Sequence, residues 1–237
     1  MTDGIYPTIG RQVGLLREMD VIAQNIANAA TTGYRAEGLV FSEHVSAGTG
    51  DAPSISFATA GGRHVRQAQG ALERTGGTLD LAIEGEGWFL VDVNGTPHLT
   101  RAGSFTAGPD GGIVTPDGNA VLDEGGAPLF VPPGTAAIHV GGDGTLSADG
   151  QPLARIGVVR PGDPLGLTRR AGTLFEAGAY VPVEAPSVRQ GFLEASNVAP
   201  VLQIARMIAV QNAYQMGQGF MDREDERMRA MFRLMDR

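Results

Sequence analysis

Histidines and carboxylates are the side chains through which this chain could bind a metal ion or transfer protons. Metal sites built on histidine need ligands at a characteristic spacing, such as the H-E-x-x-H pair on one helix. The four histidines are far apart in sequence and show no such pairing: His44, His64, His98 and His139. We therefore interpret them as ordinary strand or surface histidines and expect no metal ion and no cofactor.

Three short motifs resemble sites of chemistry. Glu84 and Glu86 could act as paired carboxylates, but their Gly-Glu-Gly-Glu-Gly setting favours a turn beside a core residue, Trp88. Residues 141–144, Gly-Gly-Asp-Gly, resemble a single calcium-binding β-roll repeat, and because that architecture needs several repeats we expect a hairpin instead. Ser104 lacks the second glycine of a nucleophile elbow. The sequence thus predicts no catalytic residue and a protein that is not an enzyme.

The residue types that are missing exclude further classes of chemistry. The 237 residues include no cysteine and no lysine, which excludes disulfides, thiolate sites, a Schiff-base lysine and the lysine of a phosphate-binding loop. A net charge of −8 gives no support to a nucleic-acid-binding surface. No apolar stretch is long enough to cross a membrane, and the start of the chain lacks the pattern of a cleavable signal. We expect neither membrane insertion nor export by a cleaved signal.

A first helix is predicted at the N-terminus from apolar spacing. Steps of four and three residues, interrupted only at Gln12, give a heptad pattern of apolar or small side chains at Ile5, Ile9, Leu16, Met19, Ala23, Ile26 and Ala30. A second stripe comprises Val13, Leu15 and Ile22. The helix should end between Asn28 and Thr32, because the following Gly33 is the residue type that most easily adopts a left-handed cap.

A second helix is predicted at the C-terminus. Its first apolar stripe comprises Val198, Leu202, Ala205, Ala209, Ala213, Met216 and Phe220. A second stripe comprises Val201, Ile204 and Ile208. Gly217 and Gly219 each weaken the helix by about 1 kcal/mol relative to alanine, which puts its continuity there in doubt.

The two helices are expected to pair antiparallel as a coiled coil, because the chain leaves along one and returns along the other. Two helices do not bury four apolar stripes, so the remaining apolar surface is predicted to face other subunits. The alternative is a closed helical domain folded on the central body. The predicted subunit-interface residues are Ile5, Ile9, Leu16, Met19, Ile22, Ile26, Val201, Leu202, Ile204, Ile208, Met216 and Phe220.

Between the helices the sequence predicts a β domain. The 35 glycines and 14 prolines argue against a mostly helical fold. Strand-like runs at 79–83, 88–93, 98–101, 113–115, 120–122, 129–131, 137–140 and 156–160 alternate with Asn-Gly and Pro-Asp-Gly turns. The expected fold class is α+β, with discontinuous terminal coiled-coil helices at 1–35 and 198–237, extended arms at 36–78 and 172–197, and a central antiparallel all-β domain at 79–171.

Three blocks of sequence resemble the rod and hook family of bacterial flagellar axial proteins. The first is Asn-Ile-Ala-Asn-Ala-Ala-Thr-Thr-Gly-Tyr-Arg at 25–35. The second is Leu-Asp-Leu-Ala-Ile-Glu-Gly-Glu-Gly-Trp-Phe at 79–89, with Leu-Thr-Arg-Ala-Gly-Ser-Phe at 99–105. The third is Gly-Phe-Leu-Glu-Ala-Ser-Asn-Val at 191–198, followed by Met-Ile at 207–208 and Gln-Asn-Ala-Tyr at 211–214. The motif residues are Asn25, Asn28, Thr31, Gly33, Tyr34, Gly87, Trp88, Phe89, Arg101, Gly103, Phe105, Glu194, Ser196, Asn197, Val198, Gln211 and Tyr214.

The resemblance implies a structural subunit of the flagellar rod in the periplasmic part of the basal body, more similar to the proximal-rod member than to distal-rod or hook members. Its terminal helices would line an inner tube that transmits torque. Implied partners are other proximal-rod and distal-rod subunits and the flagellar type III export apparatus, with peptidoglycan as a further candidate. Asn212 and Gln215 stand where relatives commonly carry Arg and Glu.

Two alternatives remain open. One is an extracellular β-domain binding module, for example for peptidoglycan, with helical oligomerisation ends. The other is a different axial member of the same family, from the distal rod or the hook. Assembly through the termini would favour a structural subunit, and saturable glycan binding by the β domain would favour the binding module.

Overall fold

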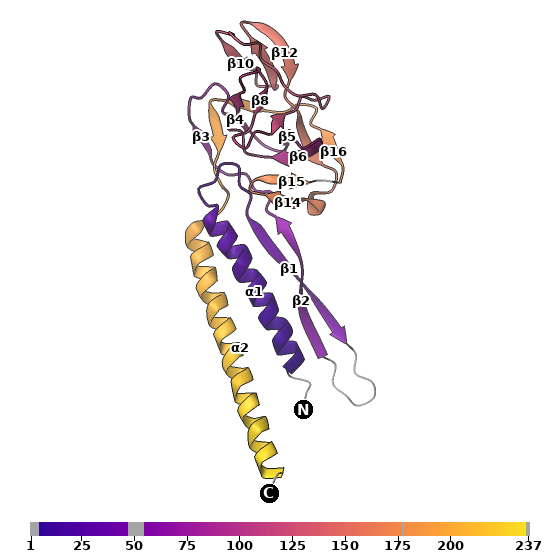
Figure 1. Ribbon diagram of the computed structural model, residues 1–237, viewed down its shortest axis with the longest axis vertical. Coiled ribbons are helices and arrows are strands. Elements are labelled where there is room, and N and C mark those ends of the chain that lie inside the picture. The colour runs from indigo at the N-terminus through magenta and orange to yellow at the C-terminus, as the bar shows by residue number, and fades with distance from the viewer. Residues whose placement is uncertain (1–4, 47–54, 177, 236–237) are drawn as a thin grey trace. The chain divides into compact units, whose positions relative to one another are not determined.

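A computed structural model describes residues 5–46, 55–176 and 178–235 (Figure 1). The chain divides into two compact units. The first, the helical unit, comprises Met1–Ala27, Glu37–His64 and Ala199–Arg237. The second, the β unit, comprises Asn28–Ala36 and Val65–Val198. The structure confirms the order of an N-terminal helix, a central antiparallel β domain and a C-terminal helix.

The helical unit contains α1 (Ile5–Ala27) and α2 (Pro200–Met235). Pro200 occupies the first position of α2, where its missing N–H costs no helical hydrogen bond. The helix runs through Gly217 and Gly219 without a break. Beyond the glycines, ion pairs one turn apart join Arg227 to Glu224 at 2.6 Å and Arg229 to Asp225 at 2.7 Å. These contacts help to offset the low helix propensity of the glycines.

Two strands complete the helical unit. β1 (Glu37–Ser46) pairs with β2 (Ile55–Val65) in a two-stranded sheet beside α1 (Figure 1). Asn25 of α1 holds the start of β1, since its Nδ2 donates to the Glu37 carbonyl at 2.8 Å and its Oδ1 accepts from the Glu37 amide at 3.0 Å. The stretch 36–78, predicted as an extended arm, is therefore largely strand. Interspersed Gly, Ser and Ala residues hide the alternation of apolar and polar residues that predicts a strand. Pairing between β1 and β2 supplies the backbone hydrogen bonds.

The β unit is built from short antiparallel strands. The strands of its N-terminal half are β3 (Leu72–Arg74), β4 (Leu81–Ile83), β5 (Trp88–Val93), β6 (Thr96–Thr100), β7 (Thr106–Ala107), β8 (Ile113–Val114) and β9 (Ala120–Val121). The strands that follow are β10 (Ile138–Val140), β11 (Thr145–Ala148), β12 (Gln151–Arg155), β13 (Val158–Pro161), β14 (Thr168–Ala171), β15 (Leu174–Glu176), β16 (Tyr180–Pro182), β17 (Val188–Gln190) and β18 (Phe192–Glu194). A short 3₁₀ helix, η1 (Pro164–Gly166), precedes β14.

The largest sheet of the β unit follows the order β14-β15-β6-β5-β9-β8-β7, with β13 joined to β5 and β16 joined to β13. A separate three-stranded sheet has the order β10-β11-β12, and β17 pairs with β4 while β18 pairs with β3. The inner face of β5 is fully buried, with Phe89 and Val91 at 0% exposure. Asn94 and Asp149, each followed by glycine, have positive φ in the turns after β5 and β11, as the two-residue hairpin turns expected from the sequence require.

The strand predictions are wrong at two places. The run 129–131 is not a strand and takes part only in isolated bridges, Pro128 to Leu122 and Phe130 to Gly112. Pro128 and Pro132 flank it and lack the N–H that a ladder requires. The arm predicted at 172–197 instead contains β15 to β18, and the last two pair with β4 and β3 from far earlier in the chain. Such short strands have too few residues to show a period.

Candidate functional site

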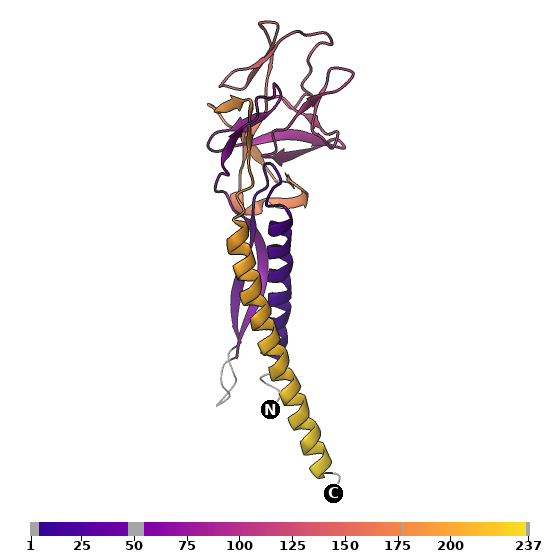
Figure 2. The ribbon, with the colours of Figure 1, turned by 90° about the vertical axis from the view of Figure 1, so that its left-hand side faces the viewer.

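The first candidate site is the surface of the two helices in the helical unit. They run antiparallel (Figure 1 and Figure 2), and described residues make polar contacts along the seam. Gln12 Nε2 donates to the Tyr214 carbonyl at 3.0 Å, Arg206 Nε lies 2.6 Å from Glu18 Oε1, and Asn25 Nδ2 donates to Gln203 Oε1 at 3.4 Å. α2 continues past the N-terminal end of α1, as Figure 2 shows. Part of α2 therefore has no partner on α1.

The face of α2 that packs on α1 differs from both predicted stripes. Buried or half-buried residues on this face recur at steps of four and three, namely Gln203, Met207, Val210, Tyr214, Gly217 and Met221. Among them only Val210 is fully buried. On α1 the buried residues are Gln12, Gly14, Val21, Ile22 and Asn25. Because the seam contains so many polar and small residues, the sequence shows no clear apolar period there. The prediction therefore followed the more apolar stripes.

The predicted interface residues mostly face solvent in the single chain. Val201 is 78% exposed, Leu202 69% and Met216 67%. The other exposed members are Ile9, Leu16, Ile204, Ile208 and Phe220. Met19 and Ile26 are half-buried, and Ile22 is buried within the chain. The side chain of Ile5 lies outside the described side chains. The helical unit thus has an apolar surface that its own residues leave uncovered.

Two irregularities of the sequence meet at the helix seam. Gln12, which interrupts the first heptad pattern, is 6% exposed. It lies so close to Gly217 that a Cβ atom at this position would be 2.1 Å from its Nε2 atom. A Cβ at this position would displace the end of the Gln12 side chain, so Gly217 leaves room for the glutamine where it crosses α2.

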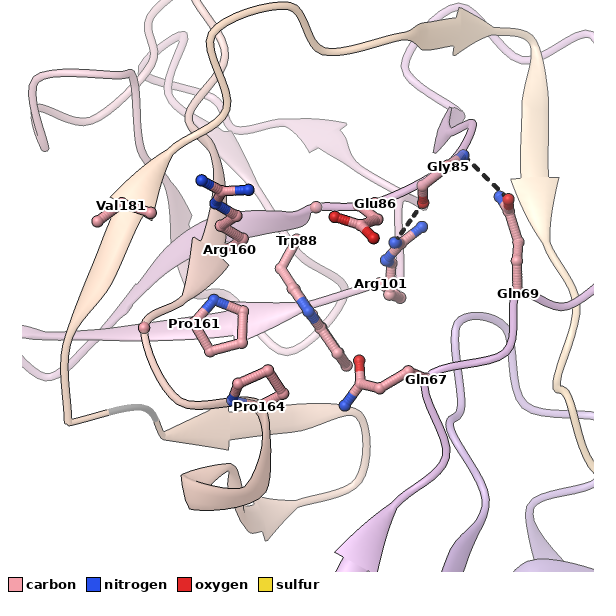
Figure 3. Close-up of a pocket in the computed structure, with 12 residues that line it drawn as sticks. Gln67, Gln69, Gly85, Glu86, Trp88, Arg101, Arg160, Pro161, Pro164 and Val181 are labelled. Atoms are coloured by element: carbon pink, nitrogen blue, oxygen red, sulfur yellow. Dashed lines mark hydrogen bonds between the residues drawn. The ribbon is translucent and has the colours of Figure 1, made fainter.

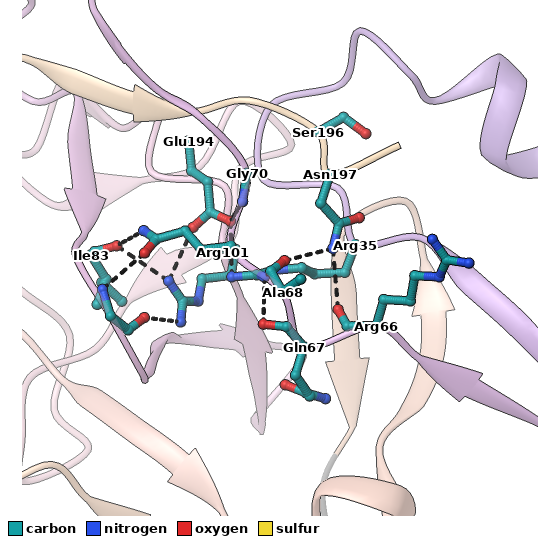
Figure 4. A network of polar contacts seen from close by, with 12 residues as sticks. Arg35, Arg66, Gln67, Ala68, Gly70, Ile83, Arg101, Glu194, Ser196 and Asn197 are labelled. Atoms are coloured by element: carbon teal, nitrogen blue, oxygen red, sulfur yellow. Dashed lines mark hydrogen bonds and ion pairs between the residues drawn. The ribbon is translucent and has the colours of Figure 1, made fainter. Parts of the chain in front are cut away.

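The second candidate site is a buried ion-pair cluster in the β unit, drawn in Figure 4. Glu194 at the end of β18 pairs through one carboxylate oxygen with Arg35 Nη2 at 2.8 Å and through the other with Arg101 Nη1 at 3.0 Å. The side chains of Arg35 and Glu194 are each 1% exposed, and that of Arg101 is 4% exposed. Further hydrogen bonds help to offset the desolvation cost of a buried charged cluster of this kind.

Backbone groups supply most of the further partners of the cluster. Arg35 Nη1 donates to the Gln67 carbonyl at 2.8 Å and also to that of Ala68. Arg101 donates to the carbonyls of Ile83 at 3.2 Å and Gly85 at 2.6 Å. The Gly70 amide donates to Glu194 Oε1 at 3.0 Å. The cluster therefore ties the strand pairs β3–β18 and β4–β17 to the segment that precedes β1.

Asn197 extends the same network. Its Nδ2 donates to the carbonyls of Ala68 at 2.7 Å and Arg66 at 3.2 Å, and its Oδ1 accepts from the Ala36 amide at 2.6 Å. Its own amide donates to the Tyr34 carbonyl at 3.2 Å. One side chain therefore holds the residues that follow α1 in sequence against those that precede α2, within the β unit.

Burial acts against the positive charges of the cluster, in which two arginines face one glutamate. It lowers the pKa of Arg35 to about 10 and also lowers the pKa of Arg101, while the charge of Glu194 opposes both shifts. Both guanidinium groups also lie against Trp88, with their Cζ atoms 5.8 and 5.7 Å from the ring centroid. The indole face gives the excess positive charge a favourable contact. Trp88 is therefore a core residue, as the sequence predicted, and packs edge-on against Phe175 at 5.0 Å.

Two motif glycines allow the chain to approach itself around this cluster. A Cβ at Gly33, whose φ is +68°, would lie 2.2 Å from the Ala102 backbone nitrogen. A Cβ at Gly103 would lie 1.7 Å from the Leu81 carbonyl oxygen. The first and second sequence blocks therefore touch through their backbones, and Glu194 joins the third block to both.

Most of the remaining motif residues take part in packing or in local hydrogen bonds. Tyr34 and Val198 share a small apolar cluster, and Phe89 packs on Phe105 with ring centroids 5.2 Å apart. Thr31 Oγ1 donates to Asn28 Oδ1 at 3.2 Å, and Ser196 Oγ accepts from the Val198 amide at 3.3 Å. Asn25 and Tyr214 belong to the helical unit, Gly87 has a φ of +129° beside Trp88, and Gln211 is exposed. Arg35 was not singled out from the sequence, although it ends the first block.

A cavity of about 610 Å³ lies beside the cluster in the β unit (Figure 3). The indole of Trp88 lies between Arg101 on one side and Pro161 and Pro164 on the other. Glu86 and Arg160 are also in its wall, whereas Glu84 is turned to an exposed ion pair with Arg189 at 2.8 Å. The described lining residues contain one carboxylate and no serine, threonine or histidine, so this wall lacks an acid–base pair.

The other motifs considered in the sequence also have structural places. The described side chains include no group of three His, Asp or Glu residues close enough to hold a metal ion. Residues 141–144 form the turn between β10 and β11, as predicted. Within the described chain, neither helix is apolar over a length that could span a membrane.

Three family models match the chain. Residues 11–35 match the flagella basal body rod protein model, residues 82–148 the flagellar hook protein FlgE/F/G D1 domain, and residues 189–234 the C-terminal model of the flagellar basal body rod FlgEFG proteins. These matches cover the same three regions of the chain as the blocks described above.

Individual relatives match this chain over nearly its whole length. The flagellar basal-body rod protein FlgF of Caulobacter vibrioides is 39% identical over 236 residues, which cover 97% of this chain and 96% of the relative. FlgF of Mesorhizobium japonicum is 38% identical over 91% of this chain and 90% of its own. The rod protein FlgG of Bacillus subtilis is 30% identical over 99% of both. Together with the buried cluster that joins the three blocks, these matches show that the chain belongs to the family of flagellar basal-body rod proteins.

Proposed function

We propose that this rod subunit assembles through the exposed faces of α1 and α2, which form a coiled-coil lining of a helical tube together with other axial subunits. The observation that carries the proposal is the uncovered apolar surface of the helical unit, with Val201, Leu202 and Met216 each more than 60% exposed. Monomeric proteins rarely expose a continuous apolar surface of this kind. The seam between α1 and α2 is satisfied by other residues, so these side chains remain available for neighbours.

The β unit acts in this proposal as a rigid and chemically passive body. Its core is closed, and within it the segment that follows α1 is hydrogen-bonded to the segment that precedes α2. The Gly33 amide donates to the Glu194 carbonyl at 2.7 Å, and the Asn197 amide donates to the Tyr34 carbonyl at 3.2 Å. A buried polar network resists distortion more than a surface contact does. The β unit would therefore resist deformation when torque is applied to the assembled rod.

The finer location belongs to the same proposal. The relatives named FlgF support a place in the proximal rod, between the export apparatus and the distal rod, in the periplasmic part of the basal body. We propose that the chain reaches this place unfolded through the flagellar type III apparatus. Its partners there are the neighbouring rod subunits.

An exposed isoleucine on α2 gives the most direct test. Ile208 is 54% exposed in the single chain, so Ile208→Asp should leave the fold intact while placing a carboxylate in a subunit seam, at a cost of several kcal/mol. We expect loss of incorporation into the basal body and loss of motility when this variant replaces the chain in cells. The matched control is Val181→Asp, which is 43% exposed on the β unit and should remain motile. Normal motility of Ile208→Asp would contradict the proposal.

A further inference from the structure

The last segment of the β unit, residues 188–198, is paired with strands from far earlier in the chain. We call this segment the strap. It contains β17, which pairs with β4, and β18, which pairs with β3, each in a separate two-stranded sheet. Within the described part of the chain, neither β3 nor β4 pairs with any other strand. The strap therefore supplies the strand pairing of both.

The bend of the strap between β17 and β18 is also fastened by its backbone. The amides of Thr75 and Gly76 donate to the Gly191 carbonyl at 2.9 and 3.1 Å. The Gly191 amide donates to the Asp80 carbonyl at 2.7 Å. The φ of Gly191 is +77°, which a glycine adopts without steric cost. The bend is thus held by the residues that connect β3 to β4.

Two side chains of the strap join it to further parts of the β unit. Gln190 Nε2 donates to the carbonyls of Thr78 at 2.8 Å and Ile138 at 3.1 Å. Its Oε1 accepts from the Val140 amide at 3.2 Å. Val188, which is 4% exposed, packs in the core of the β unit. The strap therefore links the segment before β4 to the sheet that contains β10.

The strap also carries the negative charge of the buried cluster in Figure 4. Among the described residues, Glu194 is the only carboxylate that forms an ion pair with Arg35 or Arg101. A buried charge that lacks its partner is strongly destabilising. Burial of the two arginines is therefore unfavourable until the strap is in place.

The strap is the last part of the β unit to be synthesised. The β unit ends at Val198, and the chain then continues into α2, while synthesis begins at the N-terminus. We propose that the strap is the closing element of the β unit, so that the earlier residues of this unit stay open until the strap joins them. The inference does not depend on the proposed assembly through the helices. An open β unit is also the state that the proposed export of an unfolded chain requires.

Cutting the full chain on either side of the strap tests this inference. Two versions of the chain carry an inserted protease site in an exposed stretch, one at Ala185 before the strap and one at Ala199 after it. Each is cut while folded, unfolded in denaturant and refolded over a range of dilutions. The emission of Trp88, the single tryptophan, reports closure of the β unit. The uncut versions should refold independently of concentration, which controls for the inserted site.

The two cuts differ only in whether the strap stays attached to the rest of the β unit. The chain cut at Ala185 should recover native Trp88 emission only at concentrations at which its two pieces recombine. The chain cut at Ala199, which loses only the covalent link to α2, should recover it at every dilution. Recovery of the chain cut at Ala185 at every dilution would overturn the inference. Equal loss in both cut chains would also overturn it, because α2 would then be the required element.

A substitution within the strap tests the role of its charge. In the chain cut at Ala185, Glu194→Gln should raise the concentration for half recovery roughly a hundredfold, because two buried arginines then lack a counter-charge. The matched control is Arg189→Gln in the same cut chain, which removes only an exposed ion pair with Glu84 and should leave this concentration nearly unchanged. Equal concentrations for the two variants would overturn the role of Glu194. Assembly through the helices is tested separately by Ile208→Asp, and none of these refolding results bears on it.

Discussion

The β unit and the helical unit differ in where their apolar side chains lie. In the β unit Phe89, Phe175 and Leu146 have 0% exposure and belong to closed clusters. In the helical unit Val201 and Leu202 are more exposed than buried, and Val210 is the only described residue of α2 that is buried. The apolar side chains of the first unit are enclosed in its own core, whereas many of those in the second unit face solvent in the single chain. This difference is what the proposed assembly through the helices explains.

The largest expected effect on the β unit comes from removing the shared carboxylate. Glu194→Ala leaves Arg35 and Arg101 buried without a counter-charge, so the free energy of unfolding should fall by about 3–5 kcal/mol. Chemical denaturation of the full chain, followed by tryptophan fluorescence, measures this loss because Trp88 is the single tryptophan. Glu84→Ala, which removes an exposed ion pair with Arg189, is the control and should cost about 1 kcal/mol or less. Equal losses in the two variants would mean that the buried cluster does not hold the β unit together.

The sequence allowed these differences to be predicted only in part. The exposed stripes of α1 and α2, the hairpin turns and the core position of Trp88 all follow from residue type and period. The seam between the helices could not be predicted in this way, because Gln12, Gln203 and Gly217 interrupt any apolar period. The cluster of Arg35, Arg101 and Glu194 was also missed, since the three residues come from distant segments and only the folded backbone brings them together. Short strands such as β17 and β18 are likewise defined by their partners.

A second test of the β unit truncates its central aromatic residue. Trp88 is 2% exposed and contacts Phe175 and both buried arginines. Trp88→Ala should lower stability by about 3–5 kcal/mol through the cavity it leaves. Differential scanning calorimetry of the full chain should show a lower melting temperature for the β unit. Export and motility unaffected by Trp88→Ala, together with an unchanged melting temperature, would contradict its place in the core.

Amide hydrogen exchange sharpens the contrast between the two units. In dilute monomer the helices lack their neighbours, so we expect α1 and α2 to exchange through local opening of low free energy, while β5 and β6 exchange near the limit of global unfolding. Helix content by circular dichroism should rise on assembly. If dilute monomer already protects both helices as strongly as β5, the helical unit is stable alone and the contrast between the units fails.

The smallest expected effect distinguishes two glycines within one helix. A Cβ at Gly219 meets no atom within 4 Å, so Gly219→Ala should stabilise α2 by about 1 kcal/mol through helix propensity. The same change at Gly217 gains the same propensity but forces Gln12 out of the seam, where a Cβ would lie 2.1 Å from Nε2. Gly217→Ala should therefore be neutral or destabilising, and combining it with Gln12→Ala should recover the gain. Thermal unfolding of the native chain, Gly217→Ala, Gln12→Ala and the double variant, read by circular dichroism, gives the coupling between Gly217 and Gln12. Additive effects of Gly217→Ala and Gln12→Ala would show that these two residues do not contact each other. The seam between α1 and α2 would then lack the specific contact described here.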